Sequence, residues 1–194
     1  MVFGDSLSAG YGVPLERAWV SLLEKKLQRQ GRRYQVVNAS ISGDTTQSGL
    51  ARLPAALAMH RPEVVILALG GNDGLRGLSV AQIRQNLHAM LVLLEKKKVK
   101  VLLVGVRLPP NYGPVYTRQF HQVYSQLARQ HKLRLLEFML QGVAGYKQYM
   151  QPDGVHPNVS AQPLVMENVY RHLQLLLARI PHHRSARDGT RARR

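Results

Sequence analysis

Apolar residues in this chain gather into short, nearly continuous runs that alternate with longer amphipathic stretches. Four of the runs are five to eight residues long, and they are typical of strands in a parallel sheet that is covered on both faces. A shorter apolar run leads into Gly4 and predicts another strand at the start of the chain. The predicted strands are Met1–Phe3, Tyr34–Asn38, Val64–Leu69, Val99–Val106 and Leu133–Phe138.

Between these runs, apolar positions recur every three or four residues, which predicts amphipathic helices. The clearest stripe runs from Val80 to Leu94, and Gly31 is placed to end the first helix. The apolar faces of the other helices consist of Trp19, Leu23 and Leu27; Leu50, Leu53 and Leu57; Phe120, Val123, Tyr124 and Leu127; and Val165, Val169, Leu173, Leu176 and Leu177.

The alternation of strands and helices predicts an α/β fold with three layers, α/β/α, and a flavodoxin-like parallel sheet of about five strands. The chain has 194 residues and shows no internal repeat and no linker, so we expect one domain over residues 1–180. From His182 to Arg194 there are five arginines, one aspartate and no apolar residue except alanine. Residues 181–194 are therefore predicted to be a disordered tail.

Composition narrows the class of protein. Apolar residues make up 45% of the chain and charged residues 20%, as in soluble globular proteins. No apolar run approaches the roughly 18 residues that a membrane helix needs. The chain contains no cysteine, which excludes disulfides, thiolate metal sites and thiol catalysis.

The chain is strongly basic, with a net charge of +16 from 27 Lys and Arg against 11 Asp and Glu. Outside the tail, cations cluster at the ends of predicted helices, as at Lys96–Lys98, where they complement the helix dipole. Most simply, these clusters are a solvated surface. The sharper interpretation is attraction to an anionic lipid surface, to the phosphates of acyl-CoA or to nucleic acid.

Small and polar residues follow three of the predicted strands. Gly4–Ser6 follows the first strand, Ser42–Asp44 comes after the second, and Gly70–Asp73 follows the third. Each turn by itself has a simple explanation as a helix cap or a left-handed glycine. Because ligands bind beyond the carboxyl ends of strands in open α/β sheets, their convergence at one edge predicts a functional site.

Ser6 is a candidate nucleophile, but serine reacts poorly until a base held in one tautomer takes its proton. Asp153 and His156 can supply that base and the carboxylate that orients it, although such a pair by itself is better explained as a hydrogen-bonded loop contact. The Gly43 N–H and the Asn72 amide are donors of the kind that a developing oxyanion requires. The joint presence of nucleophile, base, orienting group and donors favours a serine hydrolase.

Four blocks of the sequence, in this order, resemble the SGNH, or GDSL, hydrolase family: Gly4–Ser8, Ser42–Thr46, Gly70–Asp73 and Asp153–Pro157. Connecting segments such as Leu50–Pro54 also fit. The resemblance covers residues 1 to about 180. It is closest to the bacterial group of multifunctional acyl-CoA thioesterases, lysophospholipases and arylesterases.

The resemblance implies a hydrolase of small acyl esters and thioesters that forms an acyl-enzyme on Ser6, with His156 as base and Asp153 as its orienting group. The Ser6 N–H, the Gly43 N–H and the Asn72 side chain would form the oxyanion hole. The segments 74–78 and 107–113 resemble loops that line an acyl groove. The implied substrate-binding residues are Asp5, Asp73, Leu108, Pro109 and Tyr112.

The resemblance implies no metal and no organic cofactor. It also implies a periplasmic or secreted protein, whereas the lack of a leader before the first strand makes a cytoplasmic location the alternative. We expect a monomer that binds no specific nucleic acid.

Two other functions fit parts of the pattern. A metal- or phosphate-handling flavodoxin-like domain would use Asp5, Asp44 and Asp73, with Asp153, at the same edge. Such a receiver-like domain also needs a lysine after its last strand, and the run Leu135–Phe138 offers none. A nucleic-acid-binding protein would interleave aromatic residues with its cations, whereas Tyr and Phe are scattered here.

Overall fold

A parallel sheet of four strands forms the centre of the computed structural model, which describes residues 1–32 and 34–178. The strands are β1 (Val2–Gly4), β2 (Val64–Ala68), β3 (Lys100–Val104) and β4 (Arg134–Leu136), and they lie side by side in that order. Their register aligns one residue of each strand in a row across the sheet: Phe3, Leu67, Leu103 and Leu135. The predicted parallel α/β fold is confirmed.

The strand expected at Tyr34–Asn38 does not form as a regular strand. Val2 and Asn38 make a single parallel bridge, supported by hydrogen bonds of 2.8 Å from Val2 N–H to the Val37 carbonyl and from Ala39 N–H to the Val2 carbonyl. β1 is only three residues long, so it offers this segment little length to pair with. The segment is half-buried or exposed, and the prediction of a buried strand there is wrong.

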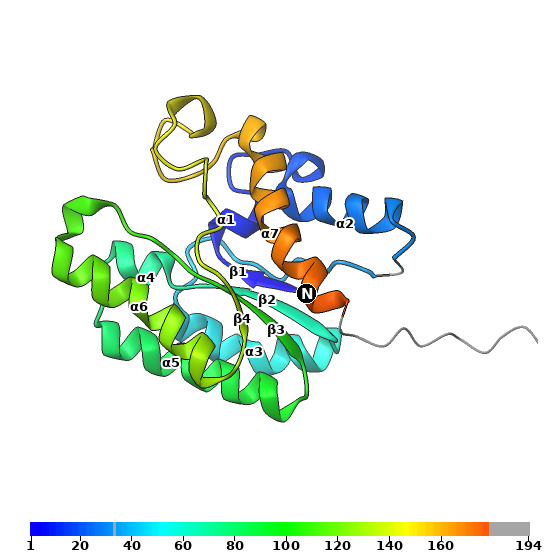
Figure 1. The fold of residues 1–194 in the computed structure, drawn as a ribbon, viewed down its shortest axis with the longest axis horizontal. Helices are drawn as coiled ribbons and strands as arrows, with labels where there is room; N and C mark the ends of the chain where they lie inside the picture. Colours follow the sequence, from blue (N-terminus) through cyan, green and yellow to red (C-terminus); the bar gives the residue numbers. More distant parts are fainter. Residues whose placement is uncertain (33, 179–194) are drawn as a thin grey trace, which may run out of the picture.

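Helices cover both faces of the sheet (Figure 1). Three of them, α3, α5 and α6, lie on one face, and α2 and α7 lie on the other. The helices are α1 (Ser6–Ala9), α2 (Trp19–Arg29), α3 (Thr46–His60), α4 (Gly71–Leu75), α5 (Val80–Lys96), α6 (Pro114–Gln130) and α7 (Gln162–Leu177), with 3-10 turns at Leu15–Arg17, Pro110–Tyr112, Lys147–Tyr149 and Val159–Ala161. As predicted, α2 ends next to Gly31, whose φ of 68° is left-handed.

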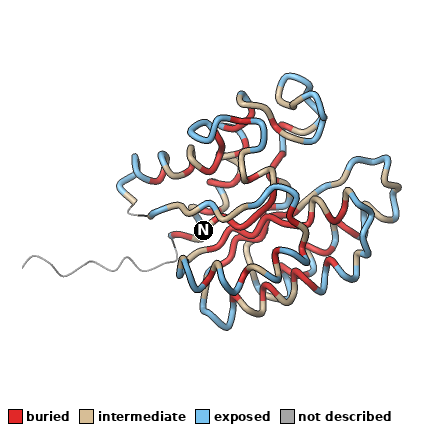
Figure 2. The backbone as a smooth tube through the Cα atoms, turned by 180° about the vertical axis from the view of Figure 1, so that it is seen from behind, coloured by how far each residue is buried: buried red, intermediate tan, exposed pale blue. Residues whose placement is uncertain are grey.

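Alternation along the strands produces two apolar cores. In β2, Ile66 and Ala68 pack with α2 and α7, whereas Val65 and Leu67 pack with α3, α5 and α6. Figure 2 shows the result as a buried central layer with exposed residues on the outer helices. Both faces of the sheet are covered, which explains why the strands are apolar at nearly every position.

The Arg-rich tail at 181–194 lies outside the described residues. In the part of the chain that the structure describes, no helix is both long and apolar enough to cross a membrane. The carboxyl ends of β1 and β2 lead directly into α1 and α4, so the residues of two predicted turns lie at the same edge of the sheet.

Candidate active site

The turn that carries Ser6 joins the end of β1 to α1. Asp5 caps this short helix by accepting a hydrogen bond of 3.1 Å from the Leu7 N–H. A side chain at Gly4 would come within 2.9 Å of the Ala68 carbonyl oxygen, so only glycine allows this close approach to β2. Ser6 is the first residue of α1, a position whose N–H has no acceptor within the helix.

His156 reaches Ser6 from a loop near the end of the chain. Its Nε2 atom lies 2.8 Å from the Oγ atom of Ser6, and its Nδ1 atom lies 2.7 Å from the Oδ2 atom of Asp153. The structure therefore brings the three predicted residues together in one unbroken series of contacts. This is the arrangement in which a base held by a carboxylate can take a proton from serine.

The carboxylate of Asp153 is held by its own loop. Its Oδ1 atom accepts hydrogen bonds from the backbone N–H groups of Val155 (2.9 Å) and His156 (3.0 Å). These bonds, led by the one from the His156 N–H, lower the pKa of Asp153 to about 2 although 39% of its side chain is exposed. Asp153 therefore stays ionised throughout the neutral range.

Tyr11 also packs against the base, which the sequence did not predict. The centroid of its ring lies 4.5 Å from that of the His156 imidazole. The Tyr11 carbonyl accepts a hydrogen bond of 2.9 Å from the Gln151 side chain, which ties the two loops together. A single tyrosine in a Gly-rich stretch carries no periodic or motif signal, so only the fold shows this contact.

The two further predicted oxyanion donors lie next to each other. Gly43 has a left-handed φ of 83°, is exposed, and has open space where a side chain would be. The Asn72 amide donates one hydrogen bond of 2.8 Å to the Asp44 carbonyl, which leaves its second N–H for another acceptor. The peptide segment Gly43–Asp44 thus carries one donor and holds the other.

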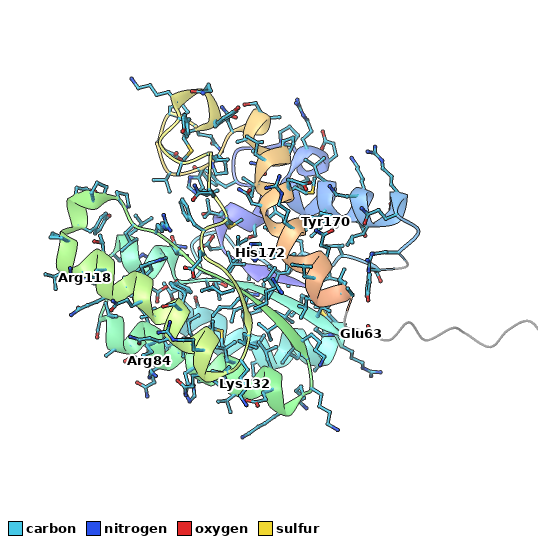
Figure 3. The ribbon with its side chains drawn as sticks, viewed as in Figure 1. Glu63, Arg84, Arg118, Lys132, Tyr170 and His172 are labelled. Carbon is cyan, nitrogen blue, oxygen red and sulfur yellow. The ribbon has the colours of Figure 1, made fainter. Side chains whose placement is uncertain are left out.

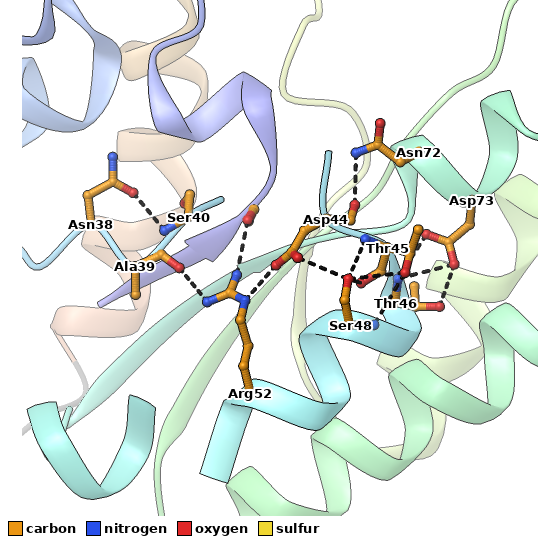
Figure 4. A network of polar contacts seen from close by, with 11 residues as sticks. Asn38, Ala39, Ser40, Asp44, Thr45, Thr46, Ser48, Arg52, Asn72 and Asp73 are labelled. Atoms are coloured by element: carbon orange, nitrogen blue, oxygen red, sulfur yellow. Dashed lines mark hydrogen bonds and ion pairs between the residues drawn. The ribbon is translucent and has the colours of Figure 1, made fainter. Parts of the chain in front are cut away.

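A polar network around the buried Asp44 carboxylate supports this segment (Figure 4). The Asp44 carboxylate pairs with Arg52 at 2.5 Å and accepts a hydrogen bond of 2.9 Å from the Ser48 hydroxyl. Arg52 lies within the segment that matches the family, but its sequence position gave no indication of a role.

Asp73 belongs to a second network beneath the first. Its carboxylate accepts hydrogen bonds from the N–H and the hydroxyl of Thr46, and the Thr46 hydroxyl in turn accepts one from Asn86. Asp73 is 1% exposed. Because its oxygens are occupied by the protein's own groups, the structure does not present Asp73 to a substrate, contrary to the expectation.

Asp5 is likewise buried, with 4% of its surface exposed. Burial raises the pKa of its carboxyl group to about 6, partly offset by the hydrogen bond from Leu7 and by the nearby His156. Asp5 adjoins the nucleophile in sequence, but its resolved contact is the helix cap. Its position is that of a structural residue under the nucleophile turn, not of a group that contacts substrate.

The other three expected substrate-binding residues lie on one segment beside α4. The Tyr112 hydroxyl donates a hydrogen bond of 2.9 Å to the Leu75 carbonyl. Leu108 packs so closely over Gly74 that a side chain there would come within 2.6 Å of a Leu108 methyl group. Pro109 is exposed between them. The two segments expected to line an acyl groove are therefore in contact.

The aspartates proposed for a metal or phosphate site do not form one. Asp5, Asp44 and Asp73 each bind groups of the protein itself. Within residues 1–32 and 34–178, no three His, Asp or Glu side chains are grouped as metal ligands. This arrangement does not support the alternative function.

Comparisons with known proteins agree with this geometry. The chain is 51% identical over 177 residues to the esterase TesA of Pseudomonas aeruginosa, a match that spans 91% of this chain and 88% of the relative. It is 45% identical over 177 residues to the thioesterase 1/protease 1/lysophospholipase L1 of Escherichia coli K12, spanning 91% of this chain and 84% of the relative.

Among solved structures, the psychrotrophic esterase EstA from Pseudoalteromonas sp., inhibited by monoethylphosphonate, superposes with a TM-score of 0.88 at 37% identity. That match covers 91% of this chain and 97% of EstA. The model of the GDSL-like Lipase/Acylhydrolase family matches residues 2–162, which include both Ser6 and His156. On sequence, fold and site together, the chain belongs to the GDSL-like lipase/acylhydrolase family.

Proposed function

We propose that this chain hydrolyses carboxylic esters and thioesters through an acyl-enzyme on Ser6. The observation that carries the proposal is the unbroken series of contacts from Ser6 Oγ through the His156 imidazole to the Asp153 carboxylate. Hydrolysis of ester bonds agrees with the family to which the chain belongs.

The reaction begins with proton transfer from Ser6 Oγ to His156 Nε2 while Oγ bonds to the acyl carbon. The carbonyl oxygen becomes an oxyanion, and Asp153 stabilises the imidazolium. When the intermediate collapses, the bond to the alcohol or thiol breaks, and His156 returns the proton to that leaving group. Water then attacks the acyl-enzyme with His156 again as base, which releases the acid and restores Ser6.

The oxyanion is stabilised by the Ser6 N–H, the Gly43 N–H and the free N–H of the Asn72 amide. Donors of this kind act mainly on the transition state, because the charge that they bind develops only there. The open space at Gly43 supports this assignment, since it leaves room for the reacting carbonyl.

The acyl chain is expected to lie against the paired segments 74–78 and 107–113. Leu108, Pro109 and Tyr112 are its proposed contacts. Tyr112 and Tyr116 both donate hydrogen bonds from their hydroxyl groups to carbonyls of the facing segment, at Leu75 and Leu78, which fixes the two segments relative to each other.

The enzyme is proposed to act as a monomer. Its basic surface favours attraction to anionic lipid surfaces as well as to the small substrate. Arg84, Arg118 and Lys132 are exposed on α5, on α6 and just after α6 (Figure 3). The family resemblance supports action in the periplasm or after secretion. The tail at 181–194 would add to the attraction for lipid.

Hydrolysis of p-nitrophenyl esters of increasing chain length tests the proposed function. Turnover should release p-nitrophenolate. A fluorophosphonate that modifies Ser6 should stop the reaction, whereas EDTA should leave the rate unchanged. Failure of the wild-type enzyme to hydrolyse any ester, or labelling at a residue other than Ser6, would contradict the proposal.

A further inference from the structure

We propose that Arg52 is a positioning residue that holds the oxyanion hole in its reactive shape. The inference rests on the proposed function, because it assigns Gly43 and Asn72 as oxyanion donors. Arg52 itself does not touch Ser6 or His156 in any resolved contact. Its effect would be exerted through the backbone of the segment 39–44.

The Arg52 guanidinium joins parts of the chain that meet at the active site. Its Nε–H donates to the Asp44 carboxylate at 2.5 Å, one terminal N–H donates to the Ala39 carbonyl at 2.6 Å, and the other donates to the Gly4 carbonyl at 3.3 Å. The group also lies over the Phe3 ring, 3.8 Å from its centroid. Figure 4 shows the hydrogen bonds that this one side chain on α3 makes.

Each of the three hydrogen bonds connects Arg52 to a residue near a proposed oxyanion donor. Gly4 ends β1 two residues before Ser6, so fixing its carbonyl fixes the start of the nucleophile turn. Ala39 and Asp44 bracket the loop that presents Gly43. The Asp44 carbonyl also holds the Asn72 amide. One guanidinium thus contacts a residue close to each of the three proposed donors.

The chemistry of the site calls for arginine in particular. Only a guanidinium presents several N–H groups in a rigid planar fork, which is what three separate acceptors require here. A lysine would keep the positive charge beside Asp44 but could not reproduce the fork or its stacking on Phe3. Arg52 is 21% exposed and its partner Asp44 is 8% exposed, so water cannot readily take over these bonds.

The ion pair has an electrostatic consequence as well. Without Arg52, the Asp44 carboxylate would stand uncompensated one peptide bond from Gly43, where negative charge develops during the reaction. A nearby like charge opposes that development. Arg52 therefore both shapes the hole and cancels a charge that would act against it.

The substitution Arg52→Lys tests the proposal with the charge retained. We expect kcat for a p-nitrophenyl ester to fall roughly ten- to hundredfold, the cost of a small misplacement of catalytic groups, with KM changed by less than about twofold. Arg52→Lys combined with Asn72→Ala should lose less than the product of the two separate losses, because both act on the same hole.

Lys26→Met is the matched control. Lys26 also pairs with a carboxylate, Glu167 at 2.6 Å, and lies over an aromatic ring, that of Tyr170, but between α2 and α7 on the face opposite α3. Tyr170 is labelled in Figure 3. This variant should lower the melting temperature while leaving kcat unchanged at temperatures where it is folded.

A second readout does not depend on turnover. In the phosphonate adduct of Ser6, the Gly43 amide proton should move downfield in the wild-type enzyme and clearly less in Arg52→Lys. The positioning role would be overturned if Arg52→Lys left both kcat and the chemical shift of the Gly43 amide proton unchanged. It would also be overturned if the losses in kcat multiplied fully in the double variant. If Ser6→Ala instead left hydrolysis intact, the proposed function itself would fail.

Discussion

The Nε2 atom of His156 lies 2.8 Å from the Oγ atom of Ser6, although 150 residues separate the two in the chain. The base is therefore within hydrogen-bond distance of the proton that it removes in the first step. It depends on the tight turn between β1 and α1 and on the long segment between β4 and α7, which the sheet and its covering helices hold at the same edge.

Ser6→Ala and His156→Ala should each lower kcat by several orders of magnitude, because the nucleophile and base act as a unit. For the same reason the double variant should lose little more than either single one. The losses are measured with a p-nitrophenyl ester, and a fluorophosphonate should label the wild-type protein at Ser6 only. Losses that multiply in the double variant would show that the two residues do not share a mechanism.

Asp153→Asn should lower kcat strongly while the fold persists, because the amide cannot stabilise the imidazolium as the carboxylate does. The lowered pKa of Asp153, about 2 against an ordinary 3.8, also predicts a pH dependence of stability. The ionised form is favoured in the folded state, so its contribution is present above pH 4 and is lost as pH falls towards 2.

Urea denaturation at several pH values measures this contribution. The wild-type protein should exceed Asp153→Asn in stability at neutral pH, and the gap should close in acid. Because the Asp153 side chain is partly exposed, solvent screening keeps the difference small. A gap that stays constant down to pH 2 would contradict the assignment of the loop contacts as the cause.

Asn72→Ala should act on the transition state. Removal of one oxyanion donor costs about 10²–10³ in kcat, and KM should barely change because the ground-state carbonyl is bound only weakly there. Asn168→Ala is a suitable control, since Asn168 also donates to backbone carbonyls, at Met139 and Gln141, but on α7. A defect confined to KM in Asn72→Ala would refute the oxyanion role.

Removal of the basic tail should weaken binding to anionic lipid without affecting the hydrolysis of a small ester. A chain ending at Ile180 is expected to keep full activity on a small neutral ester, because every proposed catalytic residue precedes Pro157. It should bind anionic vesicles more weakly than the full chain, since each arginine near such a surface adds about 1 kcal/mol. The difference should fade at high salt. Loss of small-ester hydrolysis on truncation would show that the tail serves the fold or the reaction.

The sequence predicted those parts of the fold that a local pattern determines. Val64–Leu69 formed a strand because both faces of a parallel strand are buried, which leaves a run of apolar residues. Tyr34–Asn38 also contains a pair of valines, but it includes two polar residues, lies beside a three-residue strand and makes one bridge. Strand formation there depended on the partner's length, which no local pattern contains.

The residues of the candidate site also fall into those that a local sequence pattern predicts and those that only the fold shows. Ser6, Asp153 and His156 were proposed from motifs, because their chemistry requires particular residue types within short local blocks of the sequence, even though the blocks themselves lie far apart. The packing of Tyr11 on the His156 ring and the contacts of Arg52 with backbone carbonyls were not found. A backbone carbonyl is present at every residue, so the sequence cannot show which of them an arginine will bind.

Asp5 should change the stability of the fold with pH in the opposite direction to Asp153. Burial raises its pKa to about 6 from an ordinary 3.8, so ionisation is disfavoured in the folded state. Well below pH 3.8 the carboxyl group is neutral in both states and costs nothing. Between pH 3.8 and about 6 the unfolded chain ionises while the folded protein stays neutral, so stability falls as pH rises and then levels off.

Asp5→Asn removes this titration and keeps the cap, because the amide oxygen can still accept the hydrogen bond from the Leu7 N–H. The stability of the variant relative to wild type should therefore rise between pH 4 and pH 8, by about 2 kcal/mol for a pKa difference of this size. Urea denaturation of both proteins across that range measures the change. If the two stability profiles run parallel from pH 4 to pH 8, burial does not disfavour ionisation of Asp5, and the Leu7 N–H and His156 compensate its charge in full.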